Sequence, residues 1–183
     1  PGEDMPDPSA AQSTMHLSGW LTHSSRTIHG SLCLHLGDIR YQCVCTPAYQ
    51  RRHFPEGIDT PSLSNAHAAV LHGQHSRHAF YLQQTLAHLG DFPYSSMPTP
   101  EAMLLFIRAE LGYGLIPQEY LECMSHDNEL VTLAPPLSLP LYWHHWRAEP
   151  SIAKELGEAL RTARQMRRDA QQDNATTFSA RND

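Results

Sequence analysis

The sequence predicts an α/β protein, for three reasons. Segments with strand character alternate with segments of helical periodicity, which is typical of sheets of parallel strands connected by helices. Turn-forming proline and glycine residues separate most of these segments. The chain has 183 residues, of which 40% are hydrophobic, and this is enough to bury an apolar core.

Five segments are predicted as strands, because β-branched, aromatic or continuous apolar residues run through them: 39–45, 67–71, 114–117, 130–133 and 139–146. The first alternates apolar and polar side chains and ends at Thr46-Pro47. The second is short and apolar, as a buried strand would be. Pro135 and Pro136 break the chain after the fourth, and the fifth is rich in aromatic residues.

Helices are predicted over residues 48–53, 77–89, 100–111, 118–124 and 151–168. A polar loop, residues 72–76, should precede the second, and Gly90 should close it. Thr99 is a good N-cap for the third helix, with Pro100 at its first position and Glu101 near the positive end of its dipole. Gly112 is expected to end that helix.

The last predicted helix has an apolar stripe at helical spacing, through which it should pack: Ile152, Leu156, Ala159, Ala163 and Met166. The residues after it, 171–183, are polar and aperiodic. We expect them to form a disordered tail.

Composition and charge exclude several classes of function. The net charge is −6, and no stripe of lysine and arginine interleaved with aromatic residues is present, so these residues should not hold DNA by themselves. No run approaches the roughly 20 apolar residues that cross a bilayer, and the first residues lack a secretory pattern. We therefore expect a cytoplasmic protein without membrane contact. Because the chain begins with proline, we expect it to be a piece of a longer protein.

Four cysteines give neither a disulfide framework nor a C-x-x-C pair: Cys33, Cys43, Cys45 and Cys123. We expect them to be reduced. Cys43 and Cys45 share one face of the first predicted strand, where buried cysteines commonly serve as small hydrophobic residues.

Thirteen histidines raise the possibility of a metal site. His72, His75 and His78 are spaced by three, and His144 and His145 are adjacent, but no H-E-x-x-H motif or cysteine knuckle accompanies them. We predict no metal site. The alternative is that most histidines lie in loops and on the surface, with His144 and His145 on opposite faces of a strand.

Signatures of catalysis are absent from the sequence. There is no G-x-S-x-G nucleophile turn, and the glycines at 112 and 114 follow a predicted helix, whereas a phosphate-binding loop would open one. We predict no catalytic residues and no cofactor. The helix start at Thr99 has free backbone N–H groups and a hydroxyl that could receive a small carboxylate. The alternative is that Thr99 only caps its own helix.

Three stretches in collinear order resemble the effector domain of LysR-type transcription regulators: LGDIRYQCVCTPAYQRRHF within residues 30–54, PTPEAMLLFIRAELGYGLIP at 98–117, and LYWHHWR at 141–147. Within that family they are most similar to the arginine- and lysine-responsive branch, also called chromosome initiation inhibitor. The third stretch is the most specific of the three. The resemblance extends from residue 3 to residue 169.

The resemblance implies a periplasmic-binding-protein-like α/β fold of two subdomains, with a small effector in the cleft between them. Residues 1–41 would form part of subdomain I, 42–142 subdomain II, 143–170 the return segment and helix of subdomain I, and 171–183 the tail. The helix-turn-helix, the linker helix and the first part of subdomain I have no counterpart here. Contact with DNA and assembly into a dimer or tetramer would depend on that missing part.

The resemblance also implies which residues bind the effector: Thr22, His72, Gln74, His75, Thr99 and Glu101. Thr22 and Thr99 would meet its carboxylate, while Glu101 and the 72–76 loop would meet its amine or side chain. In the arginine/lysine branch this loop is acidic, but here it contains neutral histidines and a glutamine. Neutral histidine does not offset a basic side chain as a carboxylate does.

We therefore expect an effector-sensing domain, not an enzyme, that binds an amino acid such as lysine or arginine to control transcription. Three alternatives remain. The chain could be a free-standing binding module of periplasmic type, a small α/β enzyme that uses His75 or His144, or a remnant without function. An incomplete subdomain I would leave unpaired strand edges, which predicts association through strands.

Overall fold

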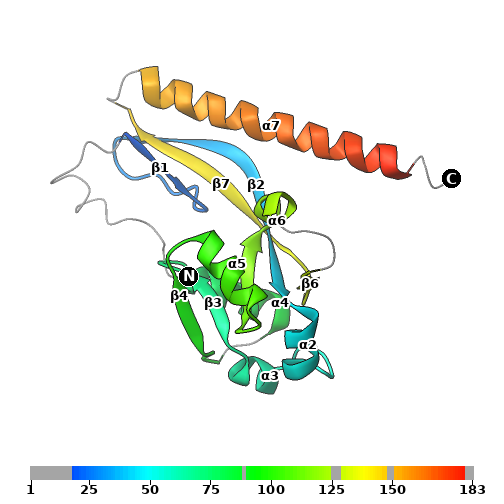
Figure 1. Cartoon of the computed structure of the whole chain (residues 1–183). Coiled ribbons are helices and arrows are strands. Elements are labelled where there is room, and N and C mark those ends of the chain that lie inside the picture. Colours follow the sequence, from blue (N-terminus) through cyan, green and yellow to red (C-terminus); the bar gives the residue numbers. More distant parts are fainter. Residues whose placement is uncertain (1–17, 88–89, 125–128, 148–150, 180–183) are drawn as a thin grey trace. The chain divides into compact units, whose positions relative to one another are not determined.

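The computed structural model describes residues 18–87, 90–124, 129–147 and 151–179, and these form two compact units (Figure 1). Unit 1 consists of the described residues within Ile39–Leu139. Unit 2 consists of those up to Asp38 and those from Pro140 onward. The chain passes from one unit into the other within two long strands, β2 (Ser31–Cys45) and β7 (Leu137–Trp146).

Unit 1 is built on a mixed sheet. Its strand order is β2, β5 (Tyr113–Pro117), β3 (Ala68–Leu71) and β4 (Tyr94–Met97). β3 runs parallel to both of its neighbours, whereas β2 is antiparallel to β5. The short β6 (Val131–Thr132) is also antiparallel to β2. The parallel strands expected of an α/β fold are present in β3, β4 and β5, whereas β2 pairs with β5 and β6 in antiparallel orientation. The apolar pattern of a buried strand does not reveal its direction.

Two layers of helices cover the two faces of this sheet. On one face α2 (Pro47–His53), α3 (Thr60–Asn65) and α4 (His75–Leu86) contribute to an apolar cluster with β2, β3 and β5: Tyr41, Cys43, Cys45, Tyr49, Leu63, Val70, Tyr81, Leu82 and Tyr113. On the other face α5 (Pro100–Arg108) and α6 (Gln118–Met124) form the second cluster: Val44, Ala69, Met103, Leu104, Ile107, Ile116 and Leu121. Neighbouring residues of β2 thus point to opposite faces, as the pleat requires.

The cysteines behave as expected. None of the four forms a disulfide, and Cys43 and Cys45 are buried in the first cluster. Burial raises the pKa of the Cys45 thiol to about 12, so it is a neutral thiol at physiological pH.

Unit 2 pairs β1 (Gly19–Thr22) with β7 in antiparallel register, and β2 follows β7 in the strand order. His144 is completely buried, with Nε2 2.9 Å from the carbonyl oxygen of Ser24 and its ring stacked on Trp20. His145, one residue on, is partly exposed. The two histidines lie on opposite faces of the strand, as the sequence predicts.

The last helix, α7 (Ser151–Ser179), differs from the prediction in two ways. It continues past residue 170, because no proline or glycine interrupts residues 171–179. Of the residues of α7 whose side chains are described, Ala153 and Gly157 are buried. Ile152 is not among these residues, while Leu156 and Met166 of the predicted stripe are 46% and 66% exposed. The indole Nε1 of Trp143 donates to the Ala153 carbonyl oxygen at 3.0 Å, which fixes the face of the helix that packs on β7.

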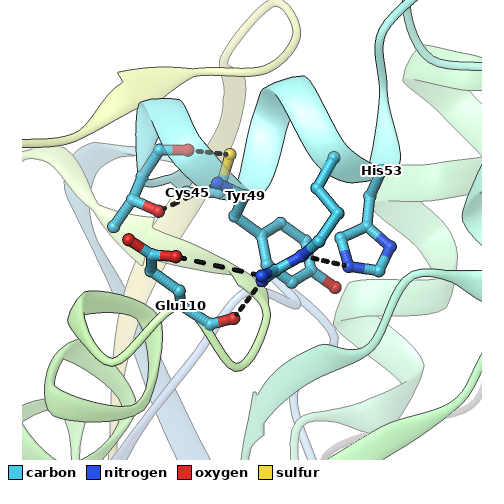
Figure 2. A network of polar contacts seen from close by, with 6 residues as sticks. Cys45, Tyr49, His53 and Glu110 are labelled. Atoms are coloured by element: carbon cyan, nitrogen blue, oxygen red, sulfur yellow. Dashed lines mark hydrogen bonds and ion pairs between the residues drawn. The ribbon is translucent and has the colours of Figure 1, made fainter.

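Helix α5 ends at Arg108, three positions earlier than predicted, because Glu110 adopts a left-handed conformation (φ 60°). Figure 2 shows the contacts around this turn. The guanidinium of Arg52 donates to the Glu110 carbonyl oxygen at 2.8 Å, lies 3.9 Å from its carboxylate and sits 5.5 Å from the centre of the Tyr49 ring. Its Nε also donates to His53 at 3.2 Å. Arg52 therefore satisfies a carbonyl at the end of α5.

Several other helices and strands differ from the sequence prediction in their ends or were not predicted. Helix α4 begins at His75, earlier than predicted, and Ala87 closes it in a left-handed conformation in place of Gly90. β2 begins at Ser31 and is much longer than the predicted segment. α3 and β4 have no counterpart in the sequence prediction. The remaining predicted helices and strands of unit 1 are present, with ends that differ by a few residues at most.

Candidate functional site

The carboxyl ends of β3 and β4 lie side by side. Leu71 is opposite Met97 in the register of these parallel strands, and the N–H of His72 donates to the Met97 carbonyl oxygen at 2.8 Å. The segments that leave the two strands, 72–74 and 98–101, therefore start next to each other. Ligands of α/β folds collect at this edge of the sheet. Five of the six predicted binding residues are in or beside these segments.

The loop after β3 is short and tightly turned. Gly73 has a φ of 74°, which favours glycine, and the N–H of Gln74 donates to the Leu71 carbonyl oxygen at 2.9 Å. The Gln74 side chain does not cap α4. Its amide oxygen instead accepts a hydrogen bond from the guanidinium of Arg77, one turn into the helix.

Two histidines of this region have different surroundings. His72 is exposed, with Nδ1 3.3 Å from the Ser96 hydroxyl on the neighbouring strand. The sequence prediction placed His75 in the loop, but in the structure it belongs to the first turn of α4. Its ring stacks on Phe92, with centroids 5.2 Å apart and planes 8° apart, and also contacts Tyr94. Aromatic packing therefore occupies one face of the His75 ring.

The start of α5 has the expected capping geometry. The Thr99 hydroxyl accepts a hydrogen bond from the N–H of Ala102 at 3.2 Å, and Pro100 is the first helical residue. Glu101 is exposed in the first turn. Its own backbone N–H, and then the Thr99 and Tyr120 hydroxyls, hold the pKa of its carboxyl below the ordinary value. This edge of the sheet therefore carries a carboxylate at neutral pH.

Thr22, the remaining predicted binding residue, belongs to unit 2. It is the last residue of β1, opposite Tyr142 in the register, and its hydroxyl accepts from the N–H of Ser24 at 3.2 Å. The structure thus gathers His72, Gln74, His75, Thr99 and Glu101 at one edge of unit 1.

Sequence reasoning missed three polar residues at this edge. Arg77 donates to the Tyr41 hydroxyl at 2.9 Å and lies 5.0 Å from the centre of that ring. Tyr41 is opposite Pro117, the last residue of β5, so this contact lies at the carboxyl end of a third parallel strand. Tyr120 follows on α6. The helical spacing of Gln74 and Arg77 could have indicated their contact, but nothing local links Arg77 to Tyr41.

No group of three or more histidine, cysteine, aspartate or glutamate side chains among the described residues could hold a metal ion. His78 faces inward and stacks on Phe92, away from His72. Within the same residues, no helix is both long enough and apolar enough to cross a membrane.

Comparison with known proteins gives one clear group of relatives. The chain is similar to the HTH-type transcriptional regulator ArgP of Pseudomonas fluorescens (strain Pf0-1), with 33% identity over 146 residues, covering 79% of this chain and 49% of that protein. The chain thus spans about half the length of the curated relatives it matches. No protein-family model matches it.

Solved structures agree on the fold. The C-terminal domains of a LysR family protein from Agrobacterium tumefaciens superpose with a TM-score of 0.69 and 24% identity, covering 88% of this chain and 77% of that chain. The full-length regulator LysG of Corynebacterium glutamicum with bound effector arginine gives a TM-score of 0.66 and 22% identity, covering 81% and 50%. The periplasmic-binding-protein-like α/β fold expected from the sequence is confirmed.

Proposed function

We propose, from the relationship of this chain to the LysR-type regulators, that it is the effector-sensing region of such a regulator and binds a small molecule to control transcription. The relationship itself is established by the similarity to ArgP, which confirms the resemblance noted in the sequence. The DNA-binding part would lie in the half of the protein that this chain does not span. Through it, we propose, the intact protein acts as a dimer or tetramer.

One observation in the structure carries this proposal. The carboxyl ends of β3 and β4 bring together donors and acceptors suited to an amino acid: the hydroxyl of Thr99, the carboxylate of Glu101, and the side chains of His72 and Gln74. We propose that Thr99 meets the carboxylate of the effector, while Glu101 meets its ammonium group. Lysine and arginine are the first candidates, because LysG was solved with arginine.

For the proposed sensing function, the effector must bind two conformational states of the regulator with different affinities. The effector would bind one arrangement of the intact regulator more tightly than another and so shift the population toward it.

An enzymatic function has less support. Both histidines that an enzyme could use, His75 and His144, have their rings packed against aromatic side chains, and the curated relatives are transcriptional regulators.

A thermal-shift screen of this chain against the twenty amino acids tests the proposal. A ligand that binds only the folded state at 100 times its Kd stabilises that state by about 2.7 kcal/mol. We expect one amino acid, or a few of similar chemistry, to raise the Tm. Glu101→Gln should reduce that rise, whereas Glu155→Gln, which removes an exposed carboxylate from α7, should leave it unchanged. If the chain melts cooperatively and no amino acid raises its Tm, the proposal is wrong.

A further inference from the structure

Two serine–histidine pairs join β4 to β3 or to the residues beside it. Ser95 Oγ lies 2.9 Å from Nε2 of His67, and Ser96 Oγ lies 3.3 Å from Nδ1 of His72. Neighbouring residues of a strand point to opposite faces, so the two pairs lie on opposite faces of the sheet. The first pair is half-buried, whereas both members of the second are exposed. The second pair is therefore the one that a ligand can reach from solvent.

The exposed pair lies at the candidate site. Ser96 is opposite Val70 in the parallel register, and His72 follows Val70 by two residues, so it points to the same face as Ser96. The backbone of His72 is held beside β4, because its N–H donates to the Met97 carbonyl oxygen at 2.8 Å. Ser96 and His72 are thus at the carboxyl ends of neighbouring parallel strands, where ligands of α/β folds collect.

The contact with Ser96 leaves one nitrogen of the His72 ring available. Among the described residues, Nε2 of His72 has no hydrogen-bond partner. A neutral imidazole has one N–H and one acceptor nitrogen, and a hydrogen bond at one nitrogen decides which role the other takes. When Nδ1–H donates to the Ser96 hydroxyl oxygen, Nε2 is left as an acceptor. Lysine and arginine side chains end in N–H donors, which an acceptor at Nε2 suits.

We infer that Ser96 is a positioning residue of the effector site, which holds the His72 ring so that Nε2 accepts a hydrogen bond from the side chain of a basic effector. This inference rests on the proposed function. It gives a neutral residue a role toward a basic ligand, because His72 then serves as an acceptor and does not have to balance the charge. A serine suits this role, since its hydroxyl oxygen can accept from Nδ1–H.

A double-mutant cycle tests this role, with the binding of L-arginine and L-lysine measured by calorimetric titration of the chain. Ser96→Ala should weaken the tighter of the two ligands about three- to tenfold, which is the effect of losing one hydrogen bond. Ser96→Thr keeps a hydroxyl and should restore most of the affinity. In a chain that already carries His72→Ala, Ser96→Ala should change the affinity by less than about twofold, because the ring through which Ser96 acts is gone.

Ser95→Ala is the matched control, because it removes the same hydroxyl from the adjacent residue, on the other face of β4, and breaks the contact with His67. Its affinity for both ligands should equal that of the unchanged chain. The melting temperature of each ligand-free variant shows whether it is folded. Where Ser96→Ala does not fold, Ser96→Thr and Ser96→Val give the same comparison, because they differ only in a hydroxyl and a methyl group.

The possible outcomes separate the inference from the proposed function. Equal weakening by Ser96→Ala with and without the His72 ring would mean that Ser96 binds the effector directly, and it overturns the positioning role. An affinity that Ser96→Ala leaves unchanged overturns it as well. Binding of other amino acids, but of neither arginine nor lysine, overturns the inference and leaves the sensing function standing. If the folded chain binds no amino acid, the proposed function is wrong and the inference fails with it.

Discussion

His78 lies on the buried side of α4, between the rings of Phe92 and Tyr113, and only 2% of its surface is exposed. Burial, and secondarily the nearby His75, lowers its pKa from 6.5 to about 3. The unfolded chain therefore binds one more proton than the folded chain between these two pH values. Stability is full above pH 6.5 and falls as the pH drops toward 3.

Urea unfolding at pH 7.5 and pH 5 should thus give a lower free energy of unfolding at pH 5. His78→Phe keeps an aromatic ring but cannot take up a proton, so it should reduce this difference. Part of the difference should remain, since the pKa of His53 is also lowered, first by burial and then by Arg52. His72→Gln, at an exposed position, should change nothing. Equal pH dependence in His78→Phe and the unchanged chain would contradict this account.

Gly112 shows a second kind of single-residue constraint. The sequence predicted it as a helix stop, but a Cβ at this position would lie 2.4 Å from the His67 carbonyl oxygen and 2.7 Å from the Phe106 ring. Gly112→Ala forces the backbone of β3 or β5 to move, and we expect a loss of about 1–3 kcal/mol in the free energy of unfolding. Leu111→Ala, at a neighbour that is 55% exposed, is the control and should cost much less.

At the scale of whole elements, local signals explain most of what the sequence predicted correctly. Thr99, Pro100 and Glu101 predicted the start of α5, and in the structure Thr99 is the N-cap of this helix. The start of α3 has similar signals, since Asp59 and Ser62 form a capping box with a proline inside the first turn. That helix was missed although its signal was present. β4 was missed for another reason: its sequence, YSSM, has little apolar character, and pairing with β3 makes it a strand.

The cap of α5 can be tested directly. Thr99→Ala removes the hydroxyl that accepts from Ala102, and we expect the free energy of unfolding to fall by about 1 kcal/mol. Thr99→Ser keeps the hydroxyl and should retain most of the stability. Thermal or urea unfolding of the three proteins measures the difference. An alanine variant as stable as the serine variant would mean that the cap contributes nothing here.

For the molecule as a whole, the candidate site was predicted from sequence similarity more than from local chemistry, and its role in binding stays a prediction. The similarity selected the loop after β3 and the start of α5, and the parallel register explains why these segments meet. It could not select Tyr41, which is 36 residues from Arg77 and reaches it only through the pairing of β2 with β5. It also assigned His75 to a loop, because the start of α4 lacks a side-chain cap that would mark it.

The two strands at the ends of the strand order, β1 and β4, each pair with one described neighbour. Unpaired edges favour association with other chains. We therefore expect this chain to associate as its concentration rises, which sedimentation velocity would detect. Leu21, 50% exposed on β1, is a suitable position to block such pairing, and Leu21→Lys should shift the chain toward monomer. Thr162→Lys, an equal charge change on exposed α7, should not. Association unaffected by Leu21→Lys would exclude this edge.

The division of the chain into units has a consequence for genetics. Within the described part of the chain, unit 1 lies between residues 39 and 139, whereas unit 2 is assembled from segments on both sides of it. A single reading frame cut at those two codons would therefore specify unit 1 alone. Unit 2 would survive the same cut only if a short linker rejoined its halves. Recombination that exchanges the stretch between the two codons could then replace the edge at the carboxyl ends of β3, β4 and β5 as one segment, leaving the coding sequence of unit 2 unchanged.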